Sequence, residues 1–350
     1  MKQTRRLPAE WEPHSAVLAA WPNNSMDWAD TLASVQACVA AIIRELSQET
    51  TVVLAAADPL ETGTFLQEMG VSLDNIRLYG MPLNDTWARD FGPITVLQTD
   101  SEGEKPLLLD WVFNGWGMKF AAHYDNMVTR RLSVAGAFGA TAIETVAHVL
   151  EGGSIESDGQ GTLLTTAQCL LDYNRNPDSD ITDIERMLCE KLGVQRVLWL
   201  HHGRLTGDDT DSHIDTLVRF CDPFTIAYTR TDDSSDEHFS CLQQMQEELE
   251  TLRTADGQPY RLIPLPLPSA IYDDEGNRLP ATYANFLITD HSVWVPQYGV
   301  TEDAAAFSTM IGLFPGRTIR GVDCLPLIQQ HGSLHCITMQ LPAGVVPEEV

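Results

Sequence analysis

Short runs of β-forming apolar residues recur along the whole chain, with segments of helical periodicity between them. Runs of this length, bounded by glycine, proline and polar residues, are typical of buried strands. A chain that alternates such strands with helices folds as an α/β protein. Strands are expected at residues 16–21, 51–55, 93–97, 106–113, 161–166, 196–200, 224–229, 286–289, 293–295 and 334–339.

The segments between these strands carry apolar residues at helical spacing. One amphipathic helix is marked by apolar residues that recur from Trp28 to Leu46. Another begins near a Thr182-x-x-Glu185 capping pattern and stops at Gly193. Strands separate these helices, which predicts repeated α/β modules, although the modules share no recognisable sequence. Further helices are expected over residues 126–137, 237–252 and 303–313.

The charge of the chain limits what it can bind. It has 350 residues, enough for one large domain or two ordinary ones, with a net charge of −27 from 49 acidic and 22 basic residues. Such a field repels nucleic acid and anionic lipid and favours cations. Acidity also serves solubility alone, so the charge permits a cationic ligand without proving one. The expected partner is a small cationic substrate, with no nucleic acid or membrane, and the chain could form a homo-oligomer.

The start of the chain and its cysteines indicate a cytoplasmic protein. The basic residues 1–6 are followed by a charged, proline-broken segment at 7–14, so no signal-peptide core is present. No apolar run approaches the length of a membrane span. The seven cysteines include no C-x-x-C pair, which argues against a disulfide framework and a structural zinc site.

The glycine-rich segments do not form a nucleotide-binding motif. The 152–153 pair and the 158–161 segment fit neither the dinucleotide fingerprint nor a P-loop. The 158–161 segment is better explained as a hairpin turn. Residues 262–268, with prolines at alternate positions, predict an edge strand or a connector.

Cys336 is the residue most suggestive of chemistry. It follows a glycine turn in the run 331–338 near the end of the chain. Three upstream segments, 84–90, 151–154 and 211–215, supply carboxylates and a histidine. A thiol with one histidine and several carboxylates suggests nucleophilic attack on a positively charged carbon.

His213 is the histidine expected to serve Cys336. A strand-like alternation would place Asp211, His213 and Asp215 on one face. Flanking carboxylates favour a protonated ring, which suits a general acid that later acts as a base. His335 is a poorer partner, because neighbouring side chains of an extended segment point to opposite faces. A purely structural histidine is the alternative explanation of His213.

The same three residues could instead bind a metal. Two carboxylates and one imidazole, from Asp211, His213 and Asp215, would suit manganese, iron or zinc. A metal-dependent hydrolase of this kind would leave Cys336 unexplained, so it ranks second.

Two further acids lie at places where a loop meets a strand. Arg89 and Asp90 precede Gly-Pro at the entrance to the strand at 93–97, a plausible loop site, although a surface ion pair is the alternative. Glu151 closes an apolar run and precedes the glycine pair 152–153, where the backbone can approach a ligand or another segment.

With these motifs the chain resembles the agmatine deiminase family, within the superfamily of arginine deiminases, amidinotransferases and bacterial-type peptidylarginine deiminases. The similarity extends over nearly the whole chain, and its motifs occur in the family order. Besides the segments above, they lie at residues 7–14, 113–117, 174–177, 283–286 and 314–317.

The resemblance implies a single catalytic domain over residues 1–350, folded as a five-bladed α/β propeller of ββαβ modules with pseudo-fivefold symmetry. Cys336 matches the family nucleophile and His213 the general acid and base. Glu151 matches the carboxylate that orients this histidine, and Asp90 and Asp215 match the pair that grips the guanidinium. The family uses no metal and no organic cofactor.

The expected reaction is hydrolysis of a guanidino C–N bond, with agmatine and water giving N-carbamoylputrescine and ammonia, a step towards putrescine. Ser212, Thr216 and the segment 330–334 depart from the usual family pattern, so free or peptidyl arginine, or another guanidino compound, stays open as the substrate. Trp87 and Asp209 resemble the positions near the far amine of agmatine, although Asp209 could simply belong to a solvated acidic turn. A catalytically inactive binding protein is the remaining alternative.

Overall fold

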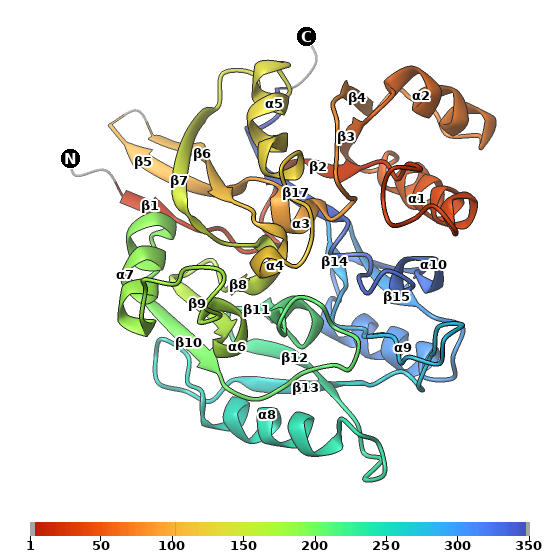
Figure 1. Ribbon diagram of the computed structural model, residues 1–350. Coiled ribbons are helices and arrows are strands. Elements are labelled where there is room, and N and C mark those ends of the chain that lie inside the picture. Colours follow the sequence, from red (N-terminus) through yellow and green to blue (C-terminus); the bar gives the residue numbers. More distant parts are fainter. Residues whose placement is uncertain (1–3, 102, 348–350) are drawn as a thin grey trace.

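The computed structural model describes residues 4–101 and 103–347, whose strands form five small sheets (Figure 1). The first sheet contains β17 (Thr338–Pro342), β2 (His14–Ala20), β3 (Thr51–Ala56) and β4 (Ile76–Gly80). The second contains β1 (Thr4–Arg6), β5 (Ile94–Asp100), β6 (Gly103–Val112) and β7 (Ala142–Val149). The third contains β10 (Arg196–Leu200), β9 (Thr162–Thr166) and β8 (Ile155–Ser157). The fourth contains β11 (Val218–Asp222), β12 (Thr225–Arg230) and β13 (Arg261–Pro266), and the fifth β14 (Leu287–Ile288), β15 (Ser292–Gln297) and β16 (Thr318–Asp323).

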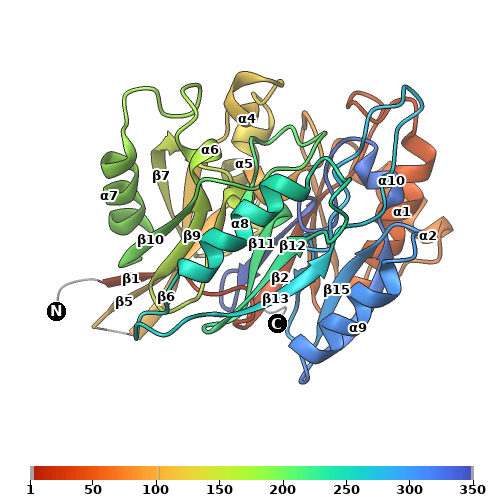
Figure 2. The same cartoon turned by 90° about the horizontal axis from the view of Figure 1, so that it is seen from below.

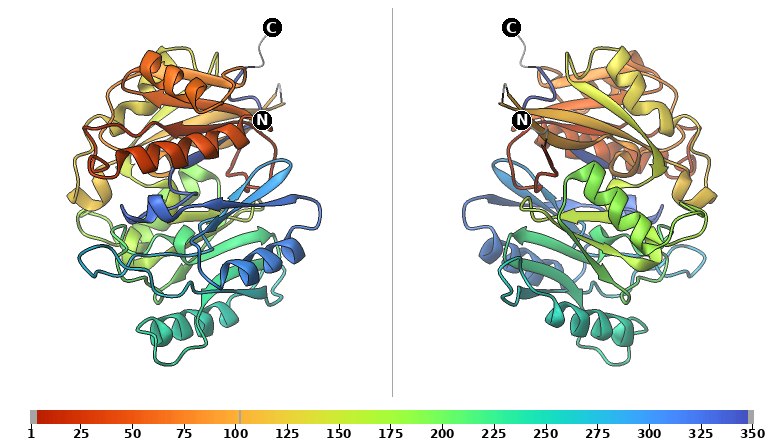
Figure 3. Two further views of the ribbon diagram at one scale, coloured as in Figure 1. Left: turned by 90° about the vertical axis from the view of Figure 1, so that its right-hand side faces the viewer. Right: turned by 90° about the vertical axis from the view of Figure 1, so that its left-hand side faces the viewer.

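The helices connect strands within these sheets or precede the loops that form the site. The longer ones are α1 (Leu32–Leu46), α2 (Pro59–Glu68), α5 (Val128–Val134), α7 (Ile181–Leu192), α8 (Phe239–Thr251) and α9 (Asp303–Leu313). The short ones are α3 (Ala88–Phe91), α4 (Gly115–Met118), α6 (Ala167–Leu170) and α10 (Leu325–Ile328), with 3-10 turns η1 (Asp125–Met127), η2 (Gly152–Ser154) and η3 (Ile214–Thr216). Figures 2 and 3 show α8 and α9 on the outer surface.

The same connection repeats in every sheet. An antiparallel pair is followed by a helical crossover to a strand that joins in parallel, as in β8–β9–β10 and β14–β15–β16. Parallel neighbours need such a crossover, because a tight turn joins antiparallel strands only. In the first sheet the antiparallel partner of β2 is β17, from the other end of the chain. The repeated α/β modules expected from the sequence are therefore present.

The core is built from the apolar faces that the periodicity indicates. The strands β2 and β3 are almost completely buried, as a strand covered on both faces must be. On α8, Leu242, Met245 and Leu249 are buried at spacings of three and four, in a cluster that also holds Phe220 and Ile226. Among the described residues, no helix has both the length and the hydropathy needed to span a membrane.

The predicted local elements match the structure in some places and differ from it in others. The helix over 303–313 matches α9, whereas α2 was not predicted. Gly193 stops α7 in the left-handed conformation (φ 73°), but the capping box is formed by Asp180 and Asp183, two residues earlier than the predicted pair. The strand predicted at 334–339 begins only at Thr338.

Two other predictions are confirmed. Asp158 accepts hydrogen bonds from the backbone N–H groups of Gln160 (2.7 Å) and Thr162 (2.8 Å) in the turn between β8 and β9, as a hairpin requires. β13, which overlaps the proline-rich segment, lies at the edge of its sheet.

Candidate active site

Cys336 lies in the turn just before β17 and is buried, with 6% of its surface exposed. Its Sγ is 3.2 Å from Asn285 Nδ2 and 3.9 Å from Asp215 Oδ2. Burial and the carboxylates of Asp215 and Asp90 raise the pKa of this thiol well above its ordinary value. In the unliganded protein, Cys336 is therefore a neutral thiol.

Asn285 shapes this turn and was not identified as a site residue from the sequence. Its Oδ1 accepts hydrogen bonds from the backbone N–H groups of His335 (2.9 Å) and Cys336 (3.3 Å). These bonds stop the chain from entering β17 directly and leave Nδ2 facing the sulfur. An N–H donor at this position favours the thiolate over the thiol. The only sequence signal for Asn285 was its place in the 283–286 motif.

Asp90 is held by neutral donors. Its Oδ2 accepts from Trp116 Nε1 (2.9 Å) and its Oδ1 from the backbone N–H of Gly153 (3.0 Å). Burial, followed by the negative charge of Asp215, raises the pKa of Asp90 well above its ordinary value. The alternative of an exposed Arg89–Asp90 pair is wrong, because both side chains are buried.

The pKa of Asp215 is lowered, in contrast to that of Asp90. Its Oδ2 accepts hydrogen bonds from His335 Nδ1 (2.7 Å) and Asn285 Nδ2 (3.3 Å). Burial alone would raise the pKa of Asp215, but the hydrogen bond and charge of His335, with further help from His213, bring it below its ordinary value. Its other oxygen, Oδ1, is buried without a hydrogen-bond partner among the described residues. This oxygen therefore has unused acceptor capacity.

His213 faces Asp90 through Nδ1, at 3.5 Å from Oδ1. Burial lowers its pKa to about 3, and the neighbouring Asp215 does not compensate. The prediction that flanking carboxylates hold this ring protonated is therefore wrong for the unliganded protein. A neutral imidazole can act as a general base, and His213 Nε2 is buried without a hydrogen-bond partner among the described residues.

The strand-like alternation predicted at 211–215 is also absent. Asp211 and Ser212 have positive φ values of 66° and 67°, and His213 precedes η3. The side chain of Thr210 accepts from the His213 backbone N–H (3.0 Å), and Asp208 accepts from that of Ser212 (2.6 Å). These local side-chain bonds replace strand pairing, as they commonly do for Ser, Thr and Asp.

Glu151 follows β7 and binds an arginine that sequence reasoning missed. Both of its carboxylate oxygens accept from Arg175 Nε, at 2.9 and 3.1 Å. Arg175 also donates from Nη1 to Asp211 (2.7 Å) and from Nη2 to the Thr210 carbonyl (2.8 Å). Arg175 thus ties Glu151 to the loop that carries His213. The sequence contained Arg175 only as part of the 174–177 motif.

Gly153 marks the point where the site residues converge. A methyl group in place of its hydrogen would lie 2.6 Å from His213 Nδ1, 2.8 Å from Asp90 Oδ1 and 3.1 Å from Asp215 Oδ2. Any larger residue would displace these three side chains. The expectation that the chain approaches closely at the 152–153 pair is confirmed.

The metal set proposed from the sequence does not assemble. Asp211 pairs with Lys119 (2.6 Å) and Arg175 (2.7 Å) instead of joining His213 and Asp215. Within the described part of the chain, the ligand atoms that do lie within 4.8 Å of one another belong to Glu151, Cys169 and His213. Glu151 already holds Arg175, whose positive charge opposes a cation there.

Cys336 and Asp90 open into a pocket of about 700 Å³. Trp87 and Asp209 both line it, as does Gly332, whose place against the Trp87 ring leaves no room for a methyl group (2.1 Å). No lysine or arginine is among the lining residues, which are Asp27, Asp85, Trp87, Asp90, Trp116, Phe120, Asp208, Asp209, Thr210, Thr216, Gln330, His331, Gly332 and Cys336. The pocket is therefore acidic and partly aromatic, which suits a cation.

Comparison with known families agrees with this geometry. Residues 6–342 match the model of the Porphyromonas-type peptidyl-arginine deiminases. The chain belongs to this family. A relative in Vibrio parahaemolyticus, named "Putative agmatine deiminase", is 32% identical over 355 residues, which cover 96% of each chain. The resemblance to agmatine deiminases noted from the motifs is thereby confirmed.

Solved structures give the same result. A crystal structure named "Putative Arginine Deiminase from Porphyromonas gingivalis" is 49% identical, with a TM-score of 0.91 over 98% of this chain and 100% of that one. The agmatine deiminase of C. jejuni with substrate bound is 33% identical, with a TM-score of 0.90 over 98% of each chain. An amidinotransferase from Streptomyces griseus, at 12% identity and a TM-score of 0.51, shares the fold alone. The chain thus has a mixed α/β fold shared with the amidinotransferases, and its family acts on guanidino groups.

Proposed function

We propose that this protein is an agmatine deiminase that hydrolyses agmatine to N-carbamoylputrescine and ammonia. The observation that carries the proposal is an acidic pocket lined by Cys336 and Asp90, with Asp215 3.9 Å from the Cys336 sulfur and the His213 imidazole 3.5 Å from Asp90. A guanidinium is planar and permanently charged, so its carbon reacts only when it is held and polarised. Asp90 and Asp215 would bind its nitrogens through charge-assisted hydrogen bonds.

In the first half of the reaction, Cys336 attacks the guanidinium carbon. His213 accepts the thiol proton, and the sulfur–carbon bond forms to give a neutral tetrahedral species. His213 then gives the proton to one nitrogen, the C–N bond breaks and ammonia leaves. A positively charged thiouronium remains bound to Cys336.

The second half uses the same residues in reverse. His213 removes a proton from water as the oxygen adds to the thiouronium carbon. The carbon–sulfur bond then breaks as the carbonyl forms, and the hydroxyl proton passes to the released ammonia. His213 returns its proton to the Cys336 thiolate, and the ureido product leaves. The net reaction converts the guanidinium and one water into the ureido compound and ammonium. Asp215 and Asp211, whose charges oppose the lowering of the His213 pKa, would stabilise the transient imidazolium. Glu151, fixed by Arg175, would orient the ring.

The lining of the pocket favours agmatine over arginine. Agmatine carries an ammonium at its far end, whereas arginine carries a carboxylate as well. The lining residues include Asp208 and Asp209 but no lysine or arginine that could bind a carboxylate. We assign the far ammonium to Asp209, with Trp87 packing along the aliphatic chain. An arginine deiminase with this mechanism is the second candidate, favoured by the 49% identity to the P. gingivalis protein of that name.

The proposal extends to the architecture. We propose that the five sheets are the blades of a propeller with pseudo-fivefold symmetry, because each contains the same antiparallel pair and parallel third strand. The loops that end these repeats carry the site: Asp90 precedes β5, Glu151 follows β7, Asp215 precedes β11 and Cys336 precedes β17. The substrate would then lie close to the pseudosymmetry axis.

Product analysis tests the function. The purified protein is incubated with agmatine, arginine or a blocked arginyl peptide, beside Cys336→Ala, and ureido product and ammonia are measured. Product from agmatine alone supports the proposal, and product from arginine or the peptide keeps the mechanism but replaces the substrate. No product from any of the three rejects the deiminase assignment.

A further inference from the structure

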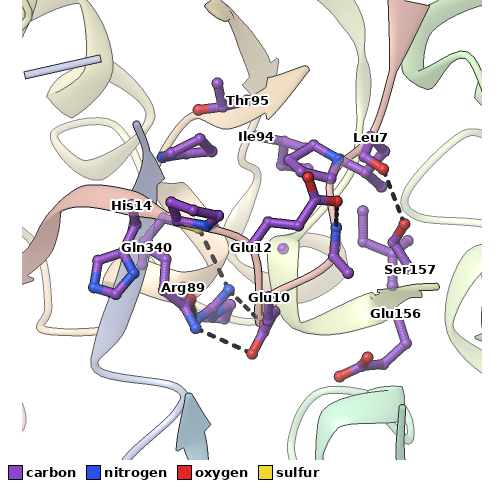
Figure 4. Close-up of a pocket in the computed structure, with 17 residues that line it drawn as sticks. Leu7, Glu10, Glu12, His14, Arg89, Ile94, Thr95, Glu156, Ser157 and Gln340 are labelled. Carbon is purple, nitrogen blue, oxygen red and sulfur yellow. Dashed lines mark hydrogen bonds and ion pairs between the residues drawn. The ribbon is translucent and has the colours of Figure 1, made fainter. Parts of the chain in front are cut away.

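A second cavity of about 650 Å³ lies beneath the N-terminal segment and shares no lining residue with the substrate pocket. Figure 4 shows Glu10, Glu12 and His14 around this rear cavity, together with Arg89 and Gln340. The glutamates here are paired: Glu12 accepts from Arg6, and Glu10 binds Arg89 at 3.2 Å. The rear cavity is thus polar but internally compensated.

One chain of hydrogen bonds joins the rear cavity to the active site. Glu10 Oε1 lies 2.6 Å from His335 Nε2, and His335 Nδ1 lies 2.7 Å from Asp215 Oδ2. The His335 side chain is 1% exposed, whereas 20% of the Glu10 side chain is exposed. The chain therefore runs from a wall of the rear cavity through a buried imidazole to a carboxylate 3.9 Å from Cys336 Sγ.

The chain determines which oxygen of Asp215 is left for a substrate. His335 and Asn285 both occupy Oδ2, and Oδ1 has no partner within the described residues. Without the His335 bond the carboxylate could rotate, and either oxygen could face the pocket. His335 Nε2 lies 2.6 Å from Glu10 Oε1 and 3.1 Å from Arg219 Nη2, so the ring is held by Glu10 and by the arginine that Glu10 binds.

The negative charge of Glu10 also suits it to hold the His335 ring. Burial alone would raise its pKa, but Arg219, His335 and Arg89 together lower it well below its ordinary value. Glu10 and Asp215 can both accept from His335 only when the ring is an imidazolium. The neutral ring donates from Nδ1 to Asp215, and its Nε2 then accepts from Arg219, which Glu10 binds. Burial and the arginines Arg219 and Arg89 lower the pKa of His335, and Glu10 and Asp215 oppose that lowering.

We propose that Glu10, acting through His335, is a positioning residue that holds Asp215 Oδ1 toward the bound guanidinium, and that the rear cavity leaves the Glu10 site open to small carboxylates from solvent. The inference rests on the proposed deiminase function for the identity of the bound group. Neither Glu10 nor His335 touches the reacting atoms.

The test removes the Glu10 carboxylate and then supplies one from solvent. Glu10→Ala is expected to raise KM for agmatine and to lower kcat/KM about ten- to hundredfold, the range for loss of a hydrogen bond between charged groups. Increasing formate is expected to restore most of this loss by occupying the vacated space, whereas equal chloride restores none. A role confined to folding would show no such rescue.

Glu12→Ala is the matched control. Glu12 lines the same cavity and pairs with Arg6, but it does not contact His335. It is expected to keep wild-type kcat/KM and to show no response to formate. Wild-type kinetics in Glu10→Ala, or a folded Glu10→Ala that formate does not restore, would overturn the proposal.

Two further experiments cover the cases in which Glu10→Ala does not fold or the protein is not a deiminase. If Glu10→Ala does not fold, Glu10→Gln keeps the shape and loses the charge, and wild-type kcat/KM in that variant also overturns the proposal. Calorimetric binding of agmatine is measured with and without Glu10→Ala in a Cys336→Ala background. Should the wild type turn over no guanidino compound while the variant still weakens agmatine binding, the deiminase function fails and the positioning role stands.

Discussion

The substrate pocket and the rear cavity are both rich in carboxylates, yet they are built in opposite ways. In the rear cavity, Glu10 pairs with Arg219 and Arg89, and burial is outweighed so that its pKa falls. In the substrate pocket, Asp90 is bound by neutral N–H groups and its pKa rises. A buried carboxylate stays ionised only when it is paired, so the paired Glu10 favours its ionised form and Asp90 favours its protonated form. Glu10 therefore has its cationic partners within the protein, whereas Asp90 would gain one only from the proposed substrate.

The largest effects should come from the residues that react. Cys336→Ala and His213→Ala are each expected to lower kcat by about ten-thousandfold or more, because the covalent intermediate or its proton transfers are lost. Steady-state ammonia release measures this. Cys189→Ala, a thiol on α7 outside both cavities, serves as the control and should leave turnover unchanged. Turnover by Cys336→Ala at the wild-type rate would remove the thiol from the mechanism.

Neutralising one carboxylate from each region, Asp90 or Glu10, should change the stability of the protein in opposite directions. Asp90→Asn should lower kcat/KM about a hundredfold or more, yet make the unliganded protein more stable at neutral pH. The folded-state pKa of Asp90 lies above its unfolded value, so the folded protein binds the proton more tightly and stability falls as the pH rises through this range. A neutral amide avoids that cost, at the loss of one of the two N–H bonds that Asp90 accepts, because only the amide oxygen is an acceptor.

Glu10→Gln should instead lower the stability of the protein at neutral pH. Its folded-state pKa lies below the unfolded value, so the carboxylate contributes stability above the unfolded pKa and loses it as the pH falls through the folded one. We expect opposite shifts of about 1 kcal/mol or more in denaturant unfolding at pH 7 for the two variants. Shifts of the same sign would contradict the comparison.

Regular elements of the fold could be predicted from the sequence, whereas an irregular loop of the site could not. Helical spacing of apolar residues located α1, whose buried side chains recur from Val35 to Leu46, and a continuous apolar run located the buried β3. The alternation of polar and apolar residues at 211–215 wrongly predicted a strand. The sequence does not show that the side chains of Asp208 and Thr210 bind the backbone of this segment.

The pairings that complete the site were beyond any local pattern. Glu10 and His335 are 325 residues apart in the chain, and Glu151 and Arg175 are 24 residues apart with two strands and a helix between them. Family motifs contained Glu10, Arg175 and Asn285 without stating their roles. The candidate catalytic residues were proposed from the sequence, whereas their hydrogen-bond partners could be identified only in the tertiary structure.

A smaller effect should appear in the pH dependence of binding. Burial and the nearby Asp27 raise the pKa of Asp85, another pocket-lining acid, to about 6. A bound cation favours the ionised carboxylate, so binding should release protons near pH 6 and KM for agmatine should rise as the pH falls below that value. Calorimetry in buffers of different ionisation enthalpy measures the release. In Asp85→Asn part of the release should disappear, and an unchanged proton count would exclude Asp85 as its source.

The smallest expected effect concerns specificity at the mouth of the pocket. The Asp209 side chain is 45% exposed and lies 3.9 Å from His331 Nε2, so water screens its attraction for an ammonium. Exposed ion pairs contribute less than about 1 kcal/mol, which corresponds to a rise in KM of about threefold for Asp209→Asn with kcat unchanged. The same variant should leave KM for a guanidino compound without the far ammonium, such as butylguanidine, unaltered. Equal changes in KM for both compounds would place Asp209 outside the ammonium site, and the specificity of the pocket would then depend on its buried acids.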